Sequence, residues 1–451
     1  KNNFKMLLNF PFRRAMYFHV NGGMLLMFAA VLALVVANSS WSEAYQAFWQ
    51  HEIILKIGNF NVLSHGGHPL TLMAFINDAL MTVFFFAVGL EIKREILVGE
   101  LSSFRKALLP IVAACGGMIL PVLIFYYLTK GTSAEAGLAI PMATDIAFSL
   151  GVLSMFGKRV PLSLKVFLTA FAVVDDIGGV LVIAIFYTSQ LNSTFIMYSI
   201  LVLIFLVACN LLKIHNKWPY IIGGFFMWYC FMQSGIHATI SGVVVAFTLP
   251  ATPRVMIGSY IQRIHECIDT IPDSNKQCII LSHKQIEALH NIKSASDKVV
   301  SPLQSLEDSL STCVNYFIMP LFAFANAGVV LTASHGGIEI GQVTWAVMLG
   351  LIIGKFCGIY LFTWLVVRMG FASLGEGMTW KNLTGICMLG GIGFTVSLFI
   401  ANLSFADSIH LLNEAKMGVL FGTIIAGILG YFILSYTLPK REDPMEAEYQ
   451  P

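Results

Sequence analysis

Residues 162–187 read LSLKVFLTAFAVVDDIGGVLVIAIFY, an apolar run with two adjacent acidic residues near its centre. A membrane-spanning helix needs about 20 predominantly apolar residues. The run is therefore long enough to cross a bilayer, and it predicts that lipid surrounds much of this chain. Because Asp175 and Asp176 lie inside it, the run also predicts a place where charge is held within the membrane.

The composition of the whole chain agrees with this prediction. Of its 451 residues, 57% are hydrophobic and only 12% are charged, whereas a soluble domain has about 25% charged residues. The net charge of +2 gives no reason to expect a nucleic-acid partner. Eight cysteines are present without a CxxC spacing, so we expect buried, inert thiols rather than disulfides or a zinc site.

Twelve apolar runs are candidates for membrane helices. They cover residues 21–38, 69–91, 107–129, 134–156, 162–187, 194–212, 217–233, 235–250, 309–331, 343–367, 380–403 and 413–437. We therefore predict an all-α membrane protein with about twelve transmembrane helices, in which residues 1–451 form a single integral membrane domain. The seventh and eighth runs are separated only by Gln233-Ser234-Gly235, so their division is the weakest part of this count.

The basic residues test the count, because cytoplasmic loops of membrane proteins are enriched in Lys and Arg. With the N-terminus inside, all but four of the 27 Lys and Arg residues fall in inner loops. Lys56, Lys130 and Lys416 fall in outer loops, and Lys355 lies within a span. One missed span would reverse every later loop, so the pattern predicts an even number of spans with both termini in the cytoplasm.

Two of the predicted loops are long. Residues 39–68 form an outer loop in which Glu52–Ile57 and Asn61–Ser64 flank Gly58-Asn59-Phe60, a pattern typical of a β-hairpin. Residues 251–308 form a polar cytoplasmic loop with scattered charges. We expect this second loop to be an amphipathic or unstructured connector and not a separate domain.

Four ionisable residues lie deep within the apolar segments: Asp145, Asp175, Asp176 and Lys355. Each charge at the centre of a membrane costs about 2.5–3.5 kcal/mol on insertion scales, and such residues usually belong to an ion or proton path. A buried Asp–Lys pair that merely joins helices is the structural alternative. Four ionisable groups in one bundle are more than such a junction requires, so we favour a transport site.

The adjacent aspartates Asp175 and Asp176 carry the chemistry of this prediction. Neighbouring positions on a helix point about 100° apart, so the two carboxylates need not touch but can reach one cavity. Burial and repulsion between carboxylates both favour protonated forms, while carboxylate oxygens are hard ligands that suit alkali cations. The same atoms can thus hold protons or a cation, and that competition is the basis of ion exchange.

The fourth and eleventh spans contain residues that interrupt helices. These are Pro141-Met142-Ala143-Thr144-Asp145 and Gly390-Gly391-Ile392-Gly393-Phe394-Thr395. Proline removes a helix hydrogen bond and glycine tolerates unwound backbone, so each motif predicts either a packing kink or a broken helix that lines a cavity. Their matching places in spans three to five and ten to twelve predict an internal repeat, with Asp145 neutralising positive helix ends and Lys355 negative ones.

Eight segments together resemble a known family, the NhaA family of bacterial sodium/proton antiporters. They are INDALMTVFFFAVGLEIKREILVGEL, PMATDIAFSLGVL, FAVVDDIGGVLVIAIFY, SGIHATISG, SPLQSLEDSL, LFAFANAG, IIGKFCGIYLF and GGIGFTVSLFIANLSF. They occur in the family's order over nearly the whole chain. The resemblance implies an inverted-topology repeat with two interrupted helices that cross at mid-membrane, so it is not independent of the repeat inferred above.

The resemblance also implies roles for the buried residues. Asp176 is expected to be the main sodium ligand, with Asp175 beside it and paired with Lys355 in one protonation state. Thr144 is expected to contribute near the ion through its hydroxyl or backbone, and Asp145 to balance the crossing helix ends. Members of the family exchange sodium or lithium for protons electrogenically, are activated at alkaline pH, and need no cofactor.

Further residues fall at the predicted cytoplasmic mouth and in the eighth span. They are Asp78, Glu91, Arg94, Glu95, His237, Glu307 and Asp308. The resemblance points to Glu91 and Glu307 in the pH response, with Asp78, Glu95 and His237 as further candidates. Salt bridging at helix ends and simple packing of His237 are the alternatives. The chain departs from the family at Asp308 and Ser311, where histidines are common, so its pH profile is expected to be shifted.

We expect a multi-pass protein of the bacterial inner membrane, not an enzyme, that uses inward proton flow to extrude sodium by alternating access. The resemblance also implies a homodimer whose contact is the outer hairpin, at about residues 52–64. An intramembrane aspartyl protease also needs two buried aspartates, but its GxGD pattern is absent. A passive cation channel is the other alternative. The sequence does not rank sodium, lithium and potassium, nor fix the stoichiometry, the pH midpoint or the role of residues 251–308.

Overall fold

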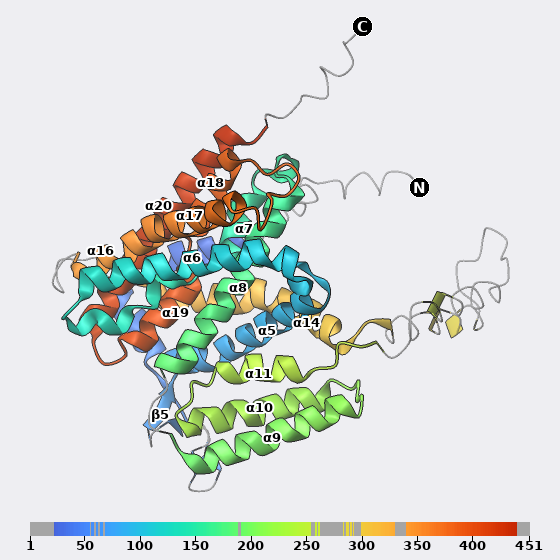
Figure 1. Ribbon diagram of the computed structural model, residues 1–451. Coiled ribbons are helices and arrows are strands. Elements are labelled where there is room, and N and C mark those ends of the chain that lie inside the picture. Colours follow the sequence, from blue (N-terminus) through green and yellow to red (C-terminus); the bar gives the residue numbers. More distant parts are fainter. Residues whose placement is uncertain are drawn as a thin grey trace, which may run out of the picture. The chain divides into compact units, whose positions relative to one another are not determined.

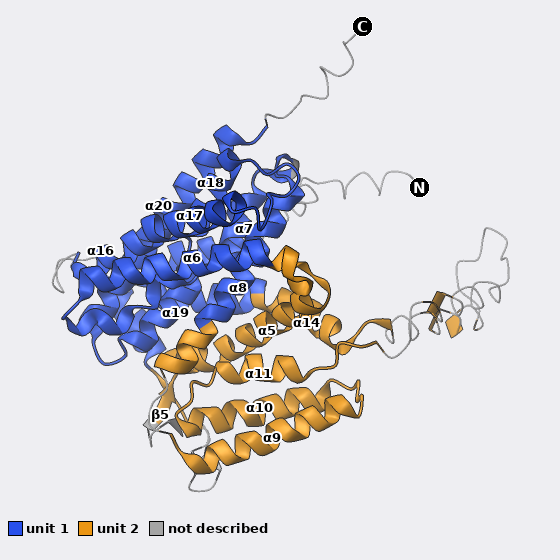
Figure 2. Ribbon diagram, in the orientation of Figure 1, with its two compact units in different colours: residues 1–50, 108–179, 315–451 blue, residues 51–107, 180–314 orange. Residues whose placement is uncertain are grey.

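The computed structural model describes residues 22–187 with short gaps between 55 and 67, residues 191–253, a few single residues between 258 and 292, and residues 299–329 and 340–439. Almost all of this is helical (Figure 1). The chain divides into two compact units (Figure 2): unit 1 comprises residues 1–50, 108–179 and 315–451, and unit 2 comprises residues 51–107 and 180–314. Most of the predicted cytoplasmic loop 251–308 lies outside the described residues.

Long apolar helices dominate the described chain, as a membrane protein requires, because helices satisfy their own backbone hydrogen bonds where water is absent. Six are long and apolar enough to cross a membrane: Leu72–Val98, Phe104–Thr129, Leu162–Phe186, Ser193–Leu211, Gln342–Arg368 and Ile409–Thr437. Three bent helix pairs raise the number to nine among the described residues. The predicted all-α membrane architecture is confirmed, and the count of twelve spans stays a prediction.

Unit 1 holds the acidic pair and both interrupted helices. Its elements are α2 (Gly22–Ala37), α3 (Ser42–Trp49), most of α6 (Phe104–Thr129), η3 (Ser133–Gly137), η4 (Ile140–Met142), α7 (Ile146–Ser154), η5 (Gly157–Arg159), most of α8 (Leu162–Phe186), α15 (Met319–Asn326), α16 (Gln342–Leu349), η8 (Gly350–Gly354), α17 (Lys355–Arg368), α18 (Trp380–Leu389), α19 (Phe394–Ser404) and α20 (Ile409–Thr437). Its core packs α8 residues such as Phe167 and Phe171 against Ile359, Ile386 and Leu389.

Unit 2 contains the remaining helices and the short strands. They are β1 (Glu52–Ile53), β2 (Lys56–Ile57), β3 (Phe60–Asn61), β4 (Ser64–His65), β5 (His68–Thr71), α4 (Leu72–Phe75), η1 (Ile76–Leu80), α5 (Met81–Val98), η2 (Glu100–Ser102), α9 (Ser193–Leu211), α10 (Trp218–Ser234), α11 (Ile240–Thr248) and α14 (Pro302–Cys313). The segment η6 (Val314–Ile318) continues α14. The core of this unit includes Leu90, Val245 and Leu306, from α5, α11 and α14.

Several helix ends differ from the apolar runs. The helix expected over residues 69–91 continues through its charged end to Val98, and the helix expected from residue 309 begins at Pro302. Hydropathy marks the lipid-facing stretch, whereas helix ends depend on caps; Ser301 caps α14 by accepting a hydrogen bond from the Gln304 amide. The run 235–250 yields a helix only over Ile240–Thr248, because Gly235, with φ of +83°, ends α10.

Residues 39–71 contain more structure than a loop with one hairpin. Helix α3 follows α2 at an angle of 113°, which the sequence did not predict. Strands β2 and β3 pair antiparallel with Ile57 opposite Phe60, and β5 pairs with both β1 and β4. Phe60, which the sequence assigned to the turn, is therefore paired in a strand.

Candidate functional site

The acidic pair lies in the middle of α8, with Asp175 1% and Asp176 3% exposed. Apolar neighbours, including Phe171, Ala172 and Val173, are all buried within unit 1. A carboxylate in such surroundings needs a charged or hydrogen-bonding partner, because an isolated ion is strongly destabilised in a medium of low dielectric constant.

Lys355 supplies that partner from α17. Its side chain is fully buried, and its Nζ lies 2.5 Å from Asp175 Oδ2 and 2.9 Å from Thr144 Oγ1. The other carboxylate oxygen, Asp175 Oδ1, is buried and accepts no hydrogen bond from the described residues. Buried polar atoms are nearly always satisfied in folded proteins, so this oxygen has the capacity to accept a further hydrogen bond or to coordinate a cation.

The first interrupted helix positions Thr144. The short turns Ser133–Gly137 and Ile140–Met142 are followed by an unwound stretch, and α7 starts at Ile146 with a bend of 42° between the two halves. Pro141 lies at the second position of the final short turn, where its missing amide proton is not needed. The unwound backbone brings Thr144, which is fully buried, to Lys355.

The second interrupted helix lies against the first. Helix α18 ends at Leu389 and α19 begins at Phe394, with a bend of 41° between them. The intervening segment, Gly390–Gly393, leaves little room for side chains: a Cβ on Gly391 would lie 2.4 Å from the Leu351 carbonyl oxygen. Glycine at this position therefore permits the close approach of backbone to backbone.

Asp145 caps the amino ends of both half-helices. Its Oδ1 accepts a hydrogen bond from the Phe148 amide of α7 at 2.9 Å, and its Oδ2 accepts from the Thr395 amide and hydroxyl of α19 at 3.1 and 2.6 Å. The Asp145 amide also donates to the Ile392 carbonyl at 2.6 Å. Because helix amino ends carry positive partial charge, one buried carboxylate stabilises two of them.

Hydroxyl groups add further hydrogen bonds at the crossing, the place where the two interrupted helices meet. Thr144 Oγ1 donates to the Gly390 carbonyl and Ser149 Oγ to the Leu389 carbonyl, each at 2.9 Å, so both satisfy the carboxyl end of α18. In the reverse direction Ser397 Oγ of α19 donates to the Ile140 carbonyl at 2.7 Å. Ser149 and Ser397 were not among the predicted site residues. The pattern that could have indicated them is a small hydroxyl residue in an otherwise apolar half-helix, four positions after Asp145 and four positions after Gly393.

Lys355 reaches the carboxyl ends of the half-helices only through Thr144. Its ammonium group donates to Thr144 Oγ1, which in turn donates to the Gly390 carbonyl. The direct charge partner of Lys355 is Asp175, so its geometry is first that of an ion pair. The ammonium also lies 5.7 Å from the centre of the Phe171 ring, a favourable distance for a cation–π contact.

Three of the residues proposed for pH response gather in unit 2. Arg94 Nη2 lies 2.9 Å from Glu95 Oε1 and Arg94 Nη1 lies 2.8 Å from Glu307 Oε1, which joins α5 to α14. Burial raises the pKa of Glu307 above its ordinary value; Arg94 acts in the opposite direction, and Asp308 and Glu95 add to the rise. Glu91 lies one turn before Arg94 on the same helix.

Asp78 and His237 lie elsewhere in unit 2. Asp78 is in η1, about 20 Å along the helix axis from Glu91 at 1.5 Å per residue. His237 is in the turn between α10 and α11, where its Nδ1 is 2.9 Å from Thr239 Oγ1. The structure therefore brings Glu95 and Glu307 together through Arg94, but it does not bring Asp78 to Glu91.

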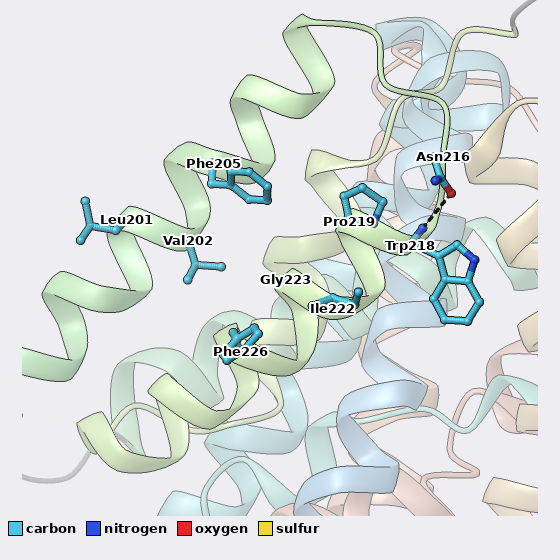
Figure 3. Close-up of a pocket in the computed structure, with 9 residues that line it drawn as sticks. All are labelled: Leu201, Val202, Phe205, Asn216, Trp218, Pro219, Ile222, Gly223 and Phe226. Carbon is cyan, nitrogen blue, oxygen red and sulfur yellow. Dashed lines mark hydrogen bonds between the residues drawn. The ribbon is translucent and has the colours of Figure 1, made fainter.

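Other sites among the described residues lack this chemistry. No group of three or more His, Cys, Asp or Glu side chains among them is placed to hold a metal ion. A groove of about 590 Å³ between α9 and α10 is lined by apolar side chains together with Asn216, whose Oδ1 accepts from the Trp218 amide at 3.3 Å (Figure 3). It offers no ionisable side chain, so the crossing in unit 1 remains the candidate site.

Comparison with known proteins identifies the family. The profile of the family described as Na+/H+ antiporter 1 matches residues 13–434. A Phocaeicola vulgatus protein named Na(+)/H(+) antiporter NhaA is 67% identical over 434 residues, which covers 96% of this chain and 97% of the relative. Relatives of the same name from Bacteroides fragilis and Porphyromonas gingivalis are 57% and 46% identical, over 94% and 95% of this chain and 97% and 96% of their own.

These matches extend through both interrupted helices and the acidic pair, so the resemblance drawn from the motifs is confirmed. The family is one of transporters and not of enzymes. This chain belongs to the Na+/H+ antiporter 1 family, the NhaA family that its motifs resemble.

Proposed function

We propose that this protein is an electrogenic sodium/proton antiporter of the bacterial inner membrane, which extrudes sodium or lithium with the inward proton gradient. The observation that carries the proposal is the buried pair of Asp175 and Lys355, in which one carboxylate oxygen has no hydrogen-bond partner among the described residues. With Asp176 next in the chain, the site offers hard oxygen ligands to a small cation.

Competition for the same oxygens couples the two ions. When Asp175 and Asp176 are ionised, they attract a sodium ion, and Thr144 adds a hydroxyl oxygen beside Asp175. When they are protonated, the cation loses its ligands. Lys355 is the third competitor, because its ammonium contacts Asp175 Oδ2, an oxygen that a bound sodium ion would also use. A site that holds either cation or protons, exposed alternately to the two sides of the membrane, moves sodium against proton flow.

Asp145 supports this exchange without binding the ion. All of its described hydrogen bonds go to the ends of α7 and α19 or to Ile392. Its charge holds the two unwound segments together, and these segments carry Thr144 to Lys355. We assign it the role of balancing the positive helix ends, so that the crossing stays intact while the nearby carboxylates change protonation.

For pH regulation we propose the charged residues of unit 2. Arg94 links Glu95 with Glu307, and Glu91 lies one turn away. Protonation of Glu307 removes the negative charge that pairs with Arg94 and so changes the contact between α5 and α14. His237 and Asp78 are further candidates; Asp78 lies about 20 Å along the helix from Glu91 at 1.5 Å per residue, and His237 lies in the turn between α10 and α11.

The membrane arrangement that goes with this function has twelve spans, inverted repeats over spans three to five and ten to twelve, and both termini in the cytoplasm. We also propose a homodimer whose contact is the hairpin at residues 52–64. The paired strands Lys56–Ile57 and Phe60–Asn61 support this, because a hairpin edge can add to a copy of itself.

Proteoliposomes with an imposed pH gradient test the proposal. The wild-type protein should accumulate sodium against its concentration gradient, whereas a passive channel would only equilibrate it. Replacing Asp176 by Asn should abolish this uptake, because the site loses its main sodium ligand. The control is Thr384→Val, at a partly exposed position of α18 that takes no part in the contact between the interrupted helices. Normal exchange by Asp176→Asn would refute the assignment. Repeating the assay with lithium and potassium ranks the cations.

A further inference from the structure

Six charged residues are buried among the described residues, and four of them, Asp145, Asp175, Asp176 and Lys355, make up the candidate site. The other two, Glu414 and Lys416, lie two positions apart in the first turns of α20, with 6% and 8% of their surfaces exposed. A buried carboxylate is costly unless its partners compensate it. The contacts of Glu414 therefore indicate what it does.

The carboxylate of Glu414 caps the amino end of α16. Its Oε2 accepts a hydrogen bond from the Val343 amide at 3.1 Å, and its backbone carbonyl accepts from Thr344 Oγ1 at 3.0 Å. Gly341, the N-cap residue of α16, makes no side-chain capping bond. A Cβ there would lie 2.1 Å from the Glu414 carboxylate, so the capping group comes from α20 because no side chain at residue 341 can supply it.

The charge of Glu414 suits this position. Helix amino ends attract negative charge, and α16, QVTWAVML, contains no ionisable residue of its own. Helix α19, which also packs against α20, contains none either. Lys416 lies two positions later on the same helix, and the titratable side chain in contact with the carboxylate is that of His410, one turn earlier, whose Nδ1 lies 3.2 Å from Glu414 Oε1 and whose side chain is 58% exposed.

The helix that Glu414 caps leads directly to the site. Residues Gln342–Arg368 form one continuous span in which α16 passes through η8 into α17, and Lys355 is the first residue of α17. Lys355 thus lies about 18 Å along the helix from Val343, at 1.5 Å per residue. The capped amino end and the ammonium group that pairs with Asp175 therefore belong to one continuous helical span.

We propose that Glu414 is a positioning residue for the exchange: as a cap supplied by α20, it anchors the helix that carries Lys355 and so fixes the ammonium against Asp175. This inference rests on the proposed function of the Asp175–Lys355 pair. In this role Glu414 does not contact the transported ions, and its exposed contact with His410 is secondary.

Sodium-induced proton release from the purified, full-length protein tests the inference without requiring turnover. In Glu414→Gln the charge at the helix end is lost, the ammonium is held less firmly, and ionised Asp175 loses part of its stabilisation. The pH of half-maximal release should then rise by about 0.5 units, equivalent to about a threefold change in proton affinity. Glu414→Asp should recover part of the shift, and His410→Ala, the matched control, should leave it within experimental error.

A double-mutant cycle separates positioning from general destabilisation. In a Lys355→Ala background, Glu414→Gln should have no further effect on the pH midpoint, because the group that it positions is gone. If the shifts of the pH midpoint caused by Lys355→Ala and Glu414→Gln are additive, the inference is overturned. It is also overturned if Glu414→Gln lowers the melting temperature but leaves the pH midpoint unchanged. Asp176→Asn is measured in parallel: if it still releases protons on sodium addition, the proposed function fails, whereas additive shifts with an inactive Asp176→Asn reject the role of Glu414 alone.

Discussion

Two ion pairs of nearly equal length are expected to contribute differently to stability, because one is buried and the other is partly exposed. In unit 1, Lys355 and Asp175 are 2.5 Å apart and both side chains are fully buried. In unit 2, Arg94 and Glu307 are 2.8 Å apart, but 38% of the Arg94 side chain and 14% of the Glu307 side chain are exposed. The distance in each pair is that of a strong charge-assisted hydrogen bond, so the solvent decides what each pair contributes.

The comparison indicates a division of labour. A buried charge whose partner is removed has no water to replace it, so the crossing in unit 1 is sensitive to every change of charge. Such sensitivity suits a site where protons, sodium and an ammonium group compete. The cluster of unit 2 is partly exposed, so water offsets part of the cost of changing its charge, which suits a regulatory contact that responds to pH.

Breaking the buried pair should have the largest effect. Lys355→Ala leaves Asp175 ionised without its partner and should lower the free energy of unfolding by about 3–5 kcal/mol, as measured by thermal melting at alkaline pH. Adding Asp175→Asn should restore most of the loss, because no uncompensated charge remains. Equal stability of Lys355→Ala and the wild type would mean that the pair is not buried in the membrane.

Removing the double cap should have the next largest effect. In Asp145→Asn one acceptor oxygen becomes an amide donor, so the amide of Phe148 or the pair of donors on Thr395 loses its acceptor. The expected cost is about 1–3 kcal/mol, the penalty for a buried unsatisfied polar group, again measured by melting. Ser404→Ala, which removes one hydroxyl hydrogen bond at the carboxyl end of α19, is the control. A cost below that of Ser404→Ala would contradict the capping role.

The cluster of unit 2 should be less sensitive. Because Arg94 is partly exposed, Arg94→Gln should cost no more than about 1 kcal/mol of stability. The exposed Lys381→Gln serves as the matched loss of one positive charge. A loss as large as that of Lys355→Ala would remove the contrast between the two units. Exchange at saturating sodium should persist in Arg94→Gln while its pH profile changes.

The smallest effect should be the pH dependence of stability due to Glu307. Because burial raises the pKa of this carboxyl above its ordinary value, its contribution to stability is complete below the ordinary pKa and is lost as the pH rises through the raised value. The melting temperature of Glu307→Gln relative to the wild type should therefore increase from acidic to neutral pH, by less than the Arg94→Gln effect. An opposite slope would show that the ion pair with Arg94 outweighs burial.

Local sequence patterns were enough to predict several helices and the positions where two of them are interrupted. The apolar runs predicted the helices Phe104–Thr129, Leu162–Phe186 and Ser193–Leu211 closely, because lipid imposes the same apolar character on every exposed turn. Pro141 and the glycines from Gly390 marked both helix breaks, since their effect on the backbone is local. Helix ends were less predictable: Pro302, Ile240 and Val98 depend on capping and on charged turns that hydropathy does not record.

Contacts between distant segments were beyond the reach of pattern. That Ser149 and Ser397 bond across the crossing and that Glu414 caps α16 each depend on segments far apart in the chain. The role of Asp145 at the positive helix ends was predicted, but its individual bonds to the Phe148 amide and to Thr395 were not. The sequence shows that these residues are polar in apolar surroundings, but not which backbone group each one meets.

Composition and local backbone preference were enough to predict that this protein is embedded in a membrane, that Asp175 and Asp176 lie within an apolar span, and that two spans are interrupted by a kink or a break. Packing of distant segments decided which atoms meet. Lys355 Nζ lies against Asp175 Oδ2 across 180 positions of the chain, a pairing that was expected only through the family resemblance, and Asp175 Oδ1 accepts no hydrogen bond from the described residues. The physical reason is that the strength of a charge or hydrogen bond depends on the partner and on the exclusion of water, and only packing supplies both.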